Sequence, residues 1–230
     1  MRVQNKNIRP FCGTTLLEIR VSQLLKIKEL DGVVVNSNDP KMLEMARKLG
    51  AATVERDPYY ASNSVTMSEV YVNMAEAMDC TDILYANVTN PLVKTESYQQ
   101  AVEAYHHLEH RHDSLASVCA VKEFLWQDGK PLNYDPARQP RSQDLPDIVK
   151  LTFAISLLPR QLMISRKNVI GYQPKLLEMD EIESLDIDTP KDFFIAEQFY
   201  RTLVLQKQEL LAADSAFPTN ASGSSACVAA

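Results

Sequence analysis

Two carboxylates, Asp186 and Asp188, are the residues whose type and spacing most clearly predict chemistry. They stand in the run ESLDIDTP, which covers residues 183–190. Side chains alternate along an extended strand, so both carboxylates point to the same side. Neighbouring negative charges repel each other, and a hard cation such as Mg²⁺ explains their placement. The alternative also stays open, because Asp-x-Asp is a common spacing: Asp186 would then be a surface charge and Asp188 a solvated turn residue.

Cations and amides elsewhere in the chain form further candidate contacts. Near the start, Lys6 and Arg9 are suited to phosphate oxygens, and Asn7 is suited to a base or a ribose. Arg141, in the run QPRSQDLP of residues 139–146, is suited to a phosphate or a carboxylate. The alternatives are a frayed basic terminus for the first segment and a polar surface loop for the second.

The elements that must position these residues alternate between strand and helix. Apolar periodicity and turn formers predict helices over 15–28, 39–49, 67–78, 96–110 and 193–211, and strands over 33–35, 52–54, 82–88, 114–121 and 153–158. This order is typical of an α/β fold with a mostly parallel, doubly wound sheet. Ligands of such sheets bind at the carboxyl ends of the strands. The candidate segments are therefore 36–39, 87–90 and 186–188.

The alternation breaks at about residue 122, where aromatic residues, prolines and arginines replace the regular pattern. Excursions of this length are typically lids or oligomer contacts, and we place the whole insertion at about residues 122–160. Residues 212–230 are rich in Ala, Ser and Asn and are predicted to be a disordered tail. The remaining domain covers residues 1–211.

Composition narrows the class of protein. The chain has 230 residues, of which 45% are hydrophobic and 23% charged, as expected for one large globular domain. A net charge of −6 argues against a nucleic-acid surface. No apolar run is long enough to cross a membrane, the start is not a signal peptide, and four scattered cysteines predict reduced thiols in a cytoplasmic protein. Six scattered glycines cannot form a glycine-rich phosphate loop within this chain.

Five segments, taken in order, resemble the acylneuraminate cytidylyltransferase family, also called CMP-sialic acid synthetases. They are NKNI (5–8), RDP with a following alanine (56–61), VTNPL (88–92), RSQDLP (141–146) and ESLDIDTP (183–190). The resemblance covers about residues 2–200. The Lys6-Asn7 pair looks like the branch that uses nonulosonic acids, which include legionaminic and pseudaminic acid. The 3-deoxy-manno-octulosonate enzymes form a related branch.

The resemblance implies a Rossmann-like nucleotidyltransferase with an inserted dimerisation segment. Such enzymes transfer CMP from CTP to an acidic nine-carbon sugar, for lipopolysaccharide or capsule biosynthesis. The anomeric hydroxyl attacks the α-phosphate and pyrophosphate leaves. By position, Asp186 and Asp188 would hold Mg²⁺, and Lys6 would stabilise charge on the α-phosphate.

Other substrate contacts follow from the same resemblance. Asn7 and Arg56 would contact the nucleotide, and Asn87 stands where the family has a glutamine near the nucleoside. Arg141 and Gln143 would approach the sugar or the phosphates, within the partner's site if the chain forms a homodimer. Lys175 is a further candidate.

The sequence also departs from the family pattern. The family opens with a strand and an Arg-x-x-Ser-Lys loop, and Met1 falls inside or just after that loop. We therefore expect a sheet without its central first strand, with apolar faces and backbone groups left unpaired, and weak activity or none. Ser156 and the Val169-Ile170 pair replace aromatic residues of the sugar pocket, so a different sugar preference is expected. A non-catalytic nucleotide-binding protein and a nucleotidyltransferase for another sugar remain alternatives.

Overall fold

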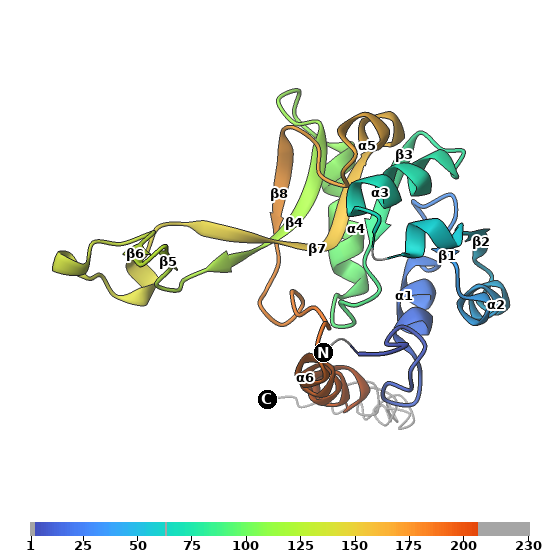
Figure 1. Cartoon of the computed structure of the whole chain (residues 1–230), viewed down its shortest axis with the longest axis horizontal. Helices are drawn as coiled ribbons and strands as arrows, with labels where there is room; N and C mark the ends of the chain where they lie inside the picture. Colours follow the sequence, from blue (N-terminus) through green and yellow to red (C-terminus); the bar gives the residue numbers. More distant parts are fainter. Residues whose placement is uncertain (1–2, 63, 207–230) are drawn as a thin grey trace, which may run out of the picture.

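The computed structural model describes residues 3–62 and 64–206 (Figure 1). Its helices and strands are, in chain order, α1 (Leu16–Leu24), β1 (Val34–Ser37), α2 (Pro40–Leu49), β2 (Ala52–Glu55), η1 (Pro58–Ala61), α3 (Met67–Glu76), β3 (Asp82–Ala86), α4 (Thr95–His106), β4 (Ser114–Val121), β5 (Trp126–Gln127), β6 (Lys130–Pro131), η2 (Pro136–Arg138), η3 (Ser142–Asp144), β7 (Ile148–Pro159), α5 (Arg160–Arg166), β8 (Pro174–Glu178), α6 (Pro190–Tyr200) and η4 (Arg201–Leu205). None of the described helices is long and apolar enough to cross a membrane.

Three of the four strands of the larger sheet run in the same direction, in line with the mostly parallel sheet that the alternation of elements predicts. Its strand order is β3-β7-β4-β8. Strand β8 runs parallel to β4, whereas β7 runs antiparallel to both β3 and β4, so β3, β4 and β8 share one direction. The antiparallel β7 follows from the chain path, because the segment that leaves the end of β4 turns back and re-enters the sheet beside it.

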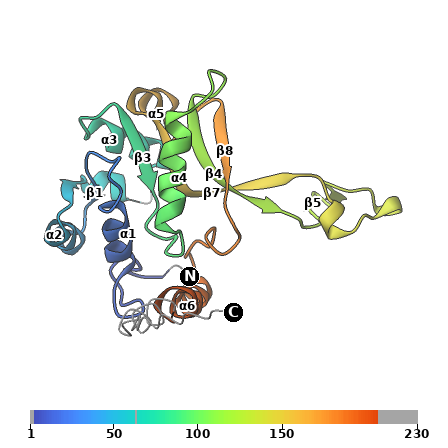
Figure 2. The ribbon, with the colours of Figure 1, turned by 180° about the vertical axis from the view of Figure 1, so that it is seen from behind.

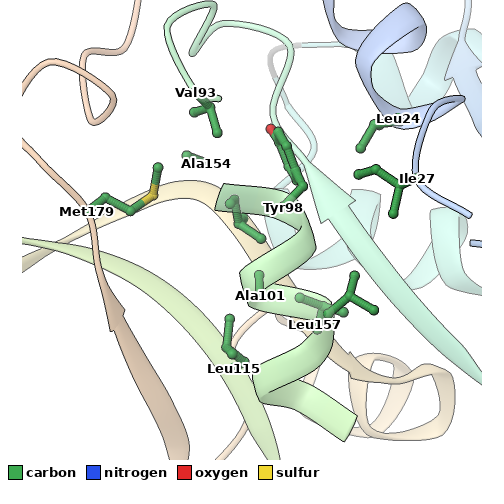
Figure 3. Close-up of a cluster of buried hydrophobic side chains, with 11 residues drawn as sticks. Leu24, Ile27, Val93, Tyr98, Ala101, Leu115, Ala154, Leu157 and Met179 are labelled. Carbon is green, nitrogen blue, oxygen red and sulfur yellow. The ribbon is translucent and has the colours of Figure 1, made fainter. Parts of the chain in front are cut away.

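Helices cover both faces of this sheet, which confirms the doubly wound arrangement. Neighbouring residues of β7 point to opposite faces. Leu157 joins the cluster formed with α4, and Leu158 joins the cluster formed with α3 and α5. Figure 3 shows the first cluster, to which α4 contributes Tyr98 and Ala101 and β7 contributes Leu157. Figure 2 shows α4 lying across β4 and β7.

A second, two-stranded sheet consists of β1 and β2, which are parallel. Within residues 3–62 and 64–206, no ladder joins β1 to β3, so the facing edges of the two sheets have no strand partner. Side chains connect the two parts, because Val33 packs both against the α1–α2 cluster and against the cluster that includes Leu84 and Ala86.

Local sequence signals account for several element boundaries. Helix α2 begins where the Asp39 carboxylate accepts a hydrogen bond from the Lys41 amide, with Pro40 at its first position. It ends at Gly50, which has a φ of 94° and supplies the left-handed terminus. Helix α4 ends at His106, earlier than the predicted residue 110.

The irregular segment forms an arm that projects from the body, with the short β5–β6 hairpin near its far end (Figure 1). We expected the insertion to cover about residues 122–160. Residues 148–159, however, form β7, which lies between β3 and β4 in the sheet. The irregular part is therefore 122–147. The predicted tail at 212–230 lies outside the described residues, as does the end of the helix predicted over 193–211.

Candidate active site

A lysine from the start of the chain meets the acidic run near its end. Lys6 Nζ lies 3.2 Å from Asp188 Oδ1, although the two residues are 182 positions apart. The same ammonium group donates to the carbonyl oxygen of Ile187. The backbone amide of Val3 also donates to the carbonyl of Asp188 at 3.4 Å. The N-terminal segment is thus fixed against the acidic run by both backbone and side-chain contacts.

Asp186 is held by the segment that follows β3. Thr89 Oγ1 donates to Asp186 Oδ1, and the Ile187 amide donates to the Thr89 carbonyl at 2.9 Å. Asn90 Nδ2 donates to the Leu185 carbonyl at 3.2 Å. Burial raises the pKa of the Asp186 carboxyl, whereas the hydrogen bond from Thr89 lowers it; the charge of Asp188 raises it and that of Lys6 lowers it. These interactions bring both aspartates and Lys6 into one electrostatic cluster.

A buried arginine of α1 hydrogen-bonds to the backbone of the segment that follows β3. Arg20 of α1 is only 2% exposed. Its guanidinium donates to the carbonyls of Asn87 (3.3 Å) and Asn90, and to Gln23 Oε1 (2.8 Å). It also lies over the ring of Tyr98, 4.7 Å from the centroid. Burial lowers the pKa of Arg20. Helix α1 thereby positions the residues that in turn hold Asp186.

Arg56 and Tyr85 connect the smaller sheet to the acidic cluster. Arg56, which follows β2, donates to Asn36 Oδ1 at 2.6 Å and to the Asn36 carbonyl at 3.0 Å. Burial lowers the pKa of Arg56, and Tyr85 raises it. Burial is also the largest cause of the raised pKa of Tyr85, whose hydroxyl feels the charges of both Arg56 and Asp186. Tyr85, near the end of β3, is therefore close enough to both groups for their charges to affect its pKa.

Sequence reasoning missed Tyr85, Thr89 and Arg20 as members of this site. Tyr85 stands in an apolar strand and Arg20 in an apolar helix, so their local patterns indicate core residues. Thr89 lies in the predicted segment 87–90, but its role depends on Asp186, which is distant in sequence. The polar neighbours of Arg56 and Asp186 become visible only in the folded chain.

Two amides predicted to bind the nucleotide lie at the edge of the cluster. Asn7 accepts a hydrogen bond from the Leu17 amide through its backbone carbonyl. Its side-chain Oδ1 is buried and has no hydrogen-bond partner among the described residues. An orphaned buried acceptor beside Lys6 is suited to a donor from a ligand. Asn87 directly follows β3, where its amide donates to the Ala154 carbonyl at 3.2 Å.

Three predicted residues are not brought to the acidic pair within one chain. Arg141 and Gln143 lie in or beside η3 of the arm, where Arg141 pairs with Asp144 at 2.7 Å on the surface. Lys175 lies at the start of β8, opposite Leu115 at the start of β4. Asp186 and Asp188 come after the carboxyl end of β8, whereas Lys175 is near its amino end. Lys175 therefore lies at the opposite end of the strands from the acidic pair.

Asp186 and Asp188 are the candidate ligands for a divalent ion. The described part of the chain contains no group of three or more His, Cys, Asp or Glu side chains that could hold a metal. Mg²⁺, however, is commonly bound by one or two protein carboxylates together with substrate phosphates and water. Asp186 and Asp188, with a lysine beside them, fit that pattern.

A doubly wound sheet with polar groups clustered at the carboxyl ends of its strands is typical of α/β nucleotide-binding folds. The chain belongs to the cytidylyltransferase family, whose model matches residues 1–211. It is therefore an enzyme of that class with CTP as its nucleotide, and the resemblance to CMP-sialic acid synthetases is confirmed at the level of the family.

Similar proteins include three curated relatives. Post-translational flagellin modification protein B of Campylobacter coli is 21% identical over 90% of this chain and 93% of that protein. N-acylneuraminate cytidylyltransferase of Oncorhynchus mykiss is 24% identical over 84% of this chain, and the match spans 46% of that protein. Pseudaminic acid cytidylyltransferase of Campylobacter jejuni subsp. jejuni serotype O:2 is 29% identical over 45% of this chain and 47% of that protein.

The fold has a counterpart among solved structures. CMP:2-keto-3-deoxy-manno-octonic acid synthetase, solved as a complex with CTP, matches with a TM-score of 0.65. The match covers 87% of this chain and 93% of that one, at 11% sequence identity. At such low identity the match shows the shared fold alone.

Proposed function

We propose that the chain transfers CMP from CTP to a nonulosonic, sialic-acid-like sugar and releases pyrophosphate. The observation that carries the proposal is the contact of Lys6 with Asp188, beside an Asp186 held by Thr89. This arrangement pairs a cation for phosphate oxygens with two carboxylates for a divalent ion. The relatives named for N-acylneuraminate and pseudaminic acid support the acceptor class.

In this proposal the nucleotide lies between the smaller sheet and the acidic run. Arg56 and Asn87 contact CTP from the carboxyl ends of β2 and β3, and Asn7 Oδ1 accepts a hydrogen bond from the nucleotide. Lys6, released from Asp188 by the incoming phosphates, stabilises the negative charge that develops on the α-phosphate. The anomeric hydroxyl of the sugar attacks that phosphorus and pyrophosphate leaves.

Asp186 and Asp188 would hold Mg²⁺, the ion implied by the family. When bound, the ion neutralises phosphate charge and makes the sugar hydroxyl more acidic. Thr89 orients Asp186 through its hydroxyl, and Asn90 fixes the backbone that carries it. These two residues therefore keep the carboxylate in place while the substrates exchange.

A pyrophosphate-release assay tests the proposed reaction. The chain is incubated with CTP, Mg²⁺ and a panel of acids comprising N-acetylneuraminic, legionaminic, pseudaminic and 3-deoxy-manno-octulosonic acid. We expect release that is weak, that requires both CTP and a nine-carbon acid, and that is lost in the Asp186→Asn, Asp188→Asn double variant. ATP, GTP and UTP serve as matched controls. The absence of CTP-dependent release with every acid would contradict the proposal.

We also propose that the arm mediates a homodimer. Trp126 and Leu132 of the arm are each 57% exposed. Trp126 Nε1 donates to the Tyr134 hydroxyl at 2.7 Å, and the Tyr134 ring packs edge-on against Phe124. Exposed aromatic residues that pack against and hydrogen-bond to each other are typical of protein–protein interfaces. In the dimer, Arg141 and Gln143 of one subunit would reach the site of the other.

Light scattering after size exclusion tests the dimer. We expect a mass of about twice the 25.9 kDa of one chain, and a single-chain mass for a Trp126→Ser, Leu132→Ser double variant. Phe194→Ser, which removes an exposed aromatic residue on α6, is the matched control. A single-chain mass for the unchanged protein at micromolar concentration would refute the dimer.

A further inference from the structure

Strand β7 contains a pronounced bulge beside the acidic run. In the pairing with β4, Ala116 lies opposite Ser156 and Val118 opposite Leu151. Ser117 alone therefore faces four residues of β7, those from Thr152 to Ile155. Within this bulge Phe153 has a φ of 54°, in the left-handed region. A bulky side chain is rare in that conformation, because its Cβ crowds the backbone.

The bulge is held in place by buried hydroxyl groups. Ser117 Oγ lies 2.6 Å from Thr152 Oγ1, and the Thr152 hydroxyl lies 3.2 Å from the Ser117 carbonyl. The Ile155 amide donates to Ser117 Oγ at 2.9 Å. Both hydroxyl-bearing residues are buried. Side-chain hydroxyls thus supply hydrogen-bond partners for the Ile155 amide and the Ser117 carbonyl, and these buried bonds help to hold the strained conformation.

The strained conformation leaves the side chain of Phe153 38% exposed, in a groove of about 390 Å³. One wall of this groove consists of β7 from Lys150 to Phe153, and the other consists of Glu181, Ser184, Leu185 and Asp186. Phe153 and Leu151 are apolar residues of its lining, and Asp186 is one of its polar residues. The groove therefore joins an apolar surface to the carboxylate that the proposed reaction uses.

We propose that Phe153 is a specificity-determining residue for the acceptor sugar. Its ring is the apolar wall against which a non-polar substituent of the acid packs, such as an acyl methyl group or a deoxygenated carbon. The sugar hydroxyl that attacks phosphorus then lies toward Asp186. This inference rests on the proposed function and adds the residue that selects among acidic sugars. Strain at a bulky residue in a cleft is the observation that singles out Phe153 from other exposed apolar residues.

Substitutions that are compatible with the left-handed backbone test this role. Phe153→Gly removes both the ring and the strain, and Phe153→Asn places a polar side chain that tolerates the same φ. We expect kcat/KM for the preferred acid to fall at least tenfold in both variants and the ranking of the acid panel to change. We expect KM for CTP to stay within twofold and the Tm not to fall. Val149→Ser, in the same strand but outside the groove, should leave all these values unchanged.

The outcomes separate the two proposals. If the unchanged chain gives no CTP-dependent pyrophosphate release, the proposed function fails, and binding of the same acids is measured by saturation-transfer NMR in place of turnover. If kcat/KM or, in that case, acid binding is within twofold of the unchanged chain in both Phe153 variants, the inference is overturned. It is also overturned if no acid binds the unchanged chain. Retained CTP affinity with altered acid selectivity supports it.

Discussion

Asp186 combines a predicted role in ion binding with an unfavourable environment for its charge. Because burial raises its pKa above the ordinary 3.8, the folded chain binds the proton more tightly than the unfolded chain does. The resulting contribution to stability is fully present below the unfolded pKa and is lost as the pH rises through the folded pKa. Near pH 7.5, the ionised carboxylate therefore opposes folding.

Asp186→Asn should consequently separate stability from activity. With EDTA present and no nucleotide, we expect its Tm at pH 7.5 to equal or exceed that of the unchanged chain, because Asn still accepts the Thr89 hydrogen bond. The difference should shrink as the pH falls toward 4. Turnover should fall by about 100-fold or more. Thermal melts across this pH range check the prediction, and a lower Tm at pH 7.5 would contradict it.

Arg20 presents the opposite problem, a buried cation that donates mainly to carbonyl groups. Arg20→Met would remove a desolvated charge, but it would leave the carbonyls of Asn87 and Asn90 without their donors. Unmade hydrogen bonds to buried groups cost about 1–3 kcal/mol each, so we expect a net loss of about 2 kcal/mol. Arg20→Lys should lose a similar amount, because an ammonium cannot reach both carbonyls as a planar fork does. Urea unfolding measures both values; unchanged stability in Arg20→Met would show that charge burial dominates.

At the scale of elements, Glu183 ties the acidic run to the start of α4. Lys94, the residue at the N-terminal boundary of that helix, has no side-chain cap. Instead Glu183, which is buried, accepts hydrogen bonds from the Lys94 amide, the Lys94 ammonium and the Ser97 hydroxyl. A carboxylate at this position also interacts favourably with the helix dipole. One side chain thus caps a helix and anchors the segment that carries Asp186.

Removing this carboxylate should destabilise the chain. We expect Glu183→Ala to lower the free energy of unfolding by about 2–3 kcal/mol, because the Lys94 amide, the Lys94 ammonium and the Ser97 hydroxyl all lose their buried acceptor. Glu183→Gln should lose about half as much, since it keeps an acceptor oxygen but not the charge. Glu181→Ala, an exposed neighbour, is the control for stability. Equal unfolding midpoints for Glu183→Ala and Glu181→Ala in urea would rule out the capping role.

Element boundaries were predictable from sequence where the signal is local. Asp39-Pro40 and Gly50 define α2, and Ser114 to Val121 was predicted as the strand that is observed. Helix α5 and strand β8 were not predicted. Helix α5 ends at Arg166 and is followed by Lys167, which has a left-handed φ of 55° without being glycine, and β8 is a short segment whose extended form depends on pairing with β4. The same holds for the candidate site. Lys6, Asp186 and Asp188 were predicted from local sequence motifs, whereas Tyr85 and Arg20 are recognised as site residues only from their contacts in the folded chain.

For the whole molecule, the break between the two sheets predicts uneven stability. Among the residues that the structure describes, strands β1 and β2 pair only with each other, whereas β4 and β7 lie inside a four-stranded sheet. Isolated two-stranded pairs are marginally stable. We therefore expect amides of residues 34–37 and 52–55 to exchange with deuterium at least about ten times faster than those of β4 and β7. Peptide-resolved hydrogen exchange measures this, and equal protection of both regions would disagree with the prediction.

The same break affects how a substrate is held. Arg56 belongs to the part of the chain that carries β1 and β2, and Asp186 belongs to the part that carries the larger sheet. A nucleotide that touches both residues would bridge the two sheets, which are not joined by strand pairing within the described residues. Some of its binding free energy would then be spent on aligning the two halves, so measured affinity would report the rigidity of the protein as well as the quality of its contacts.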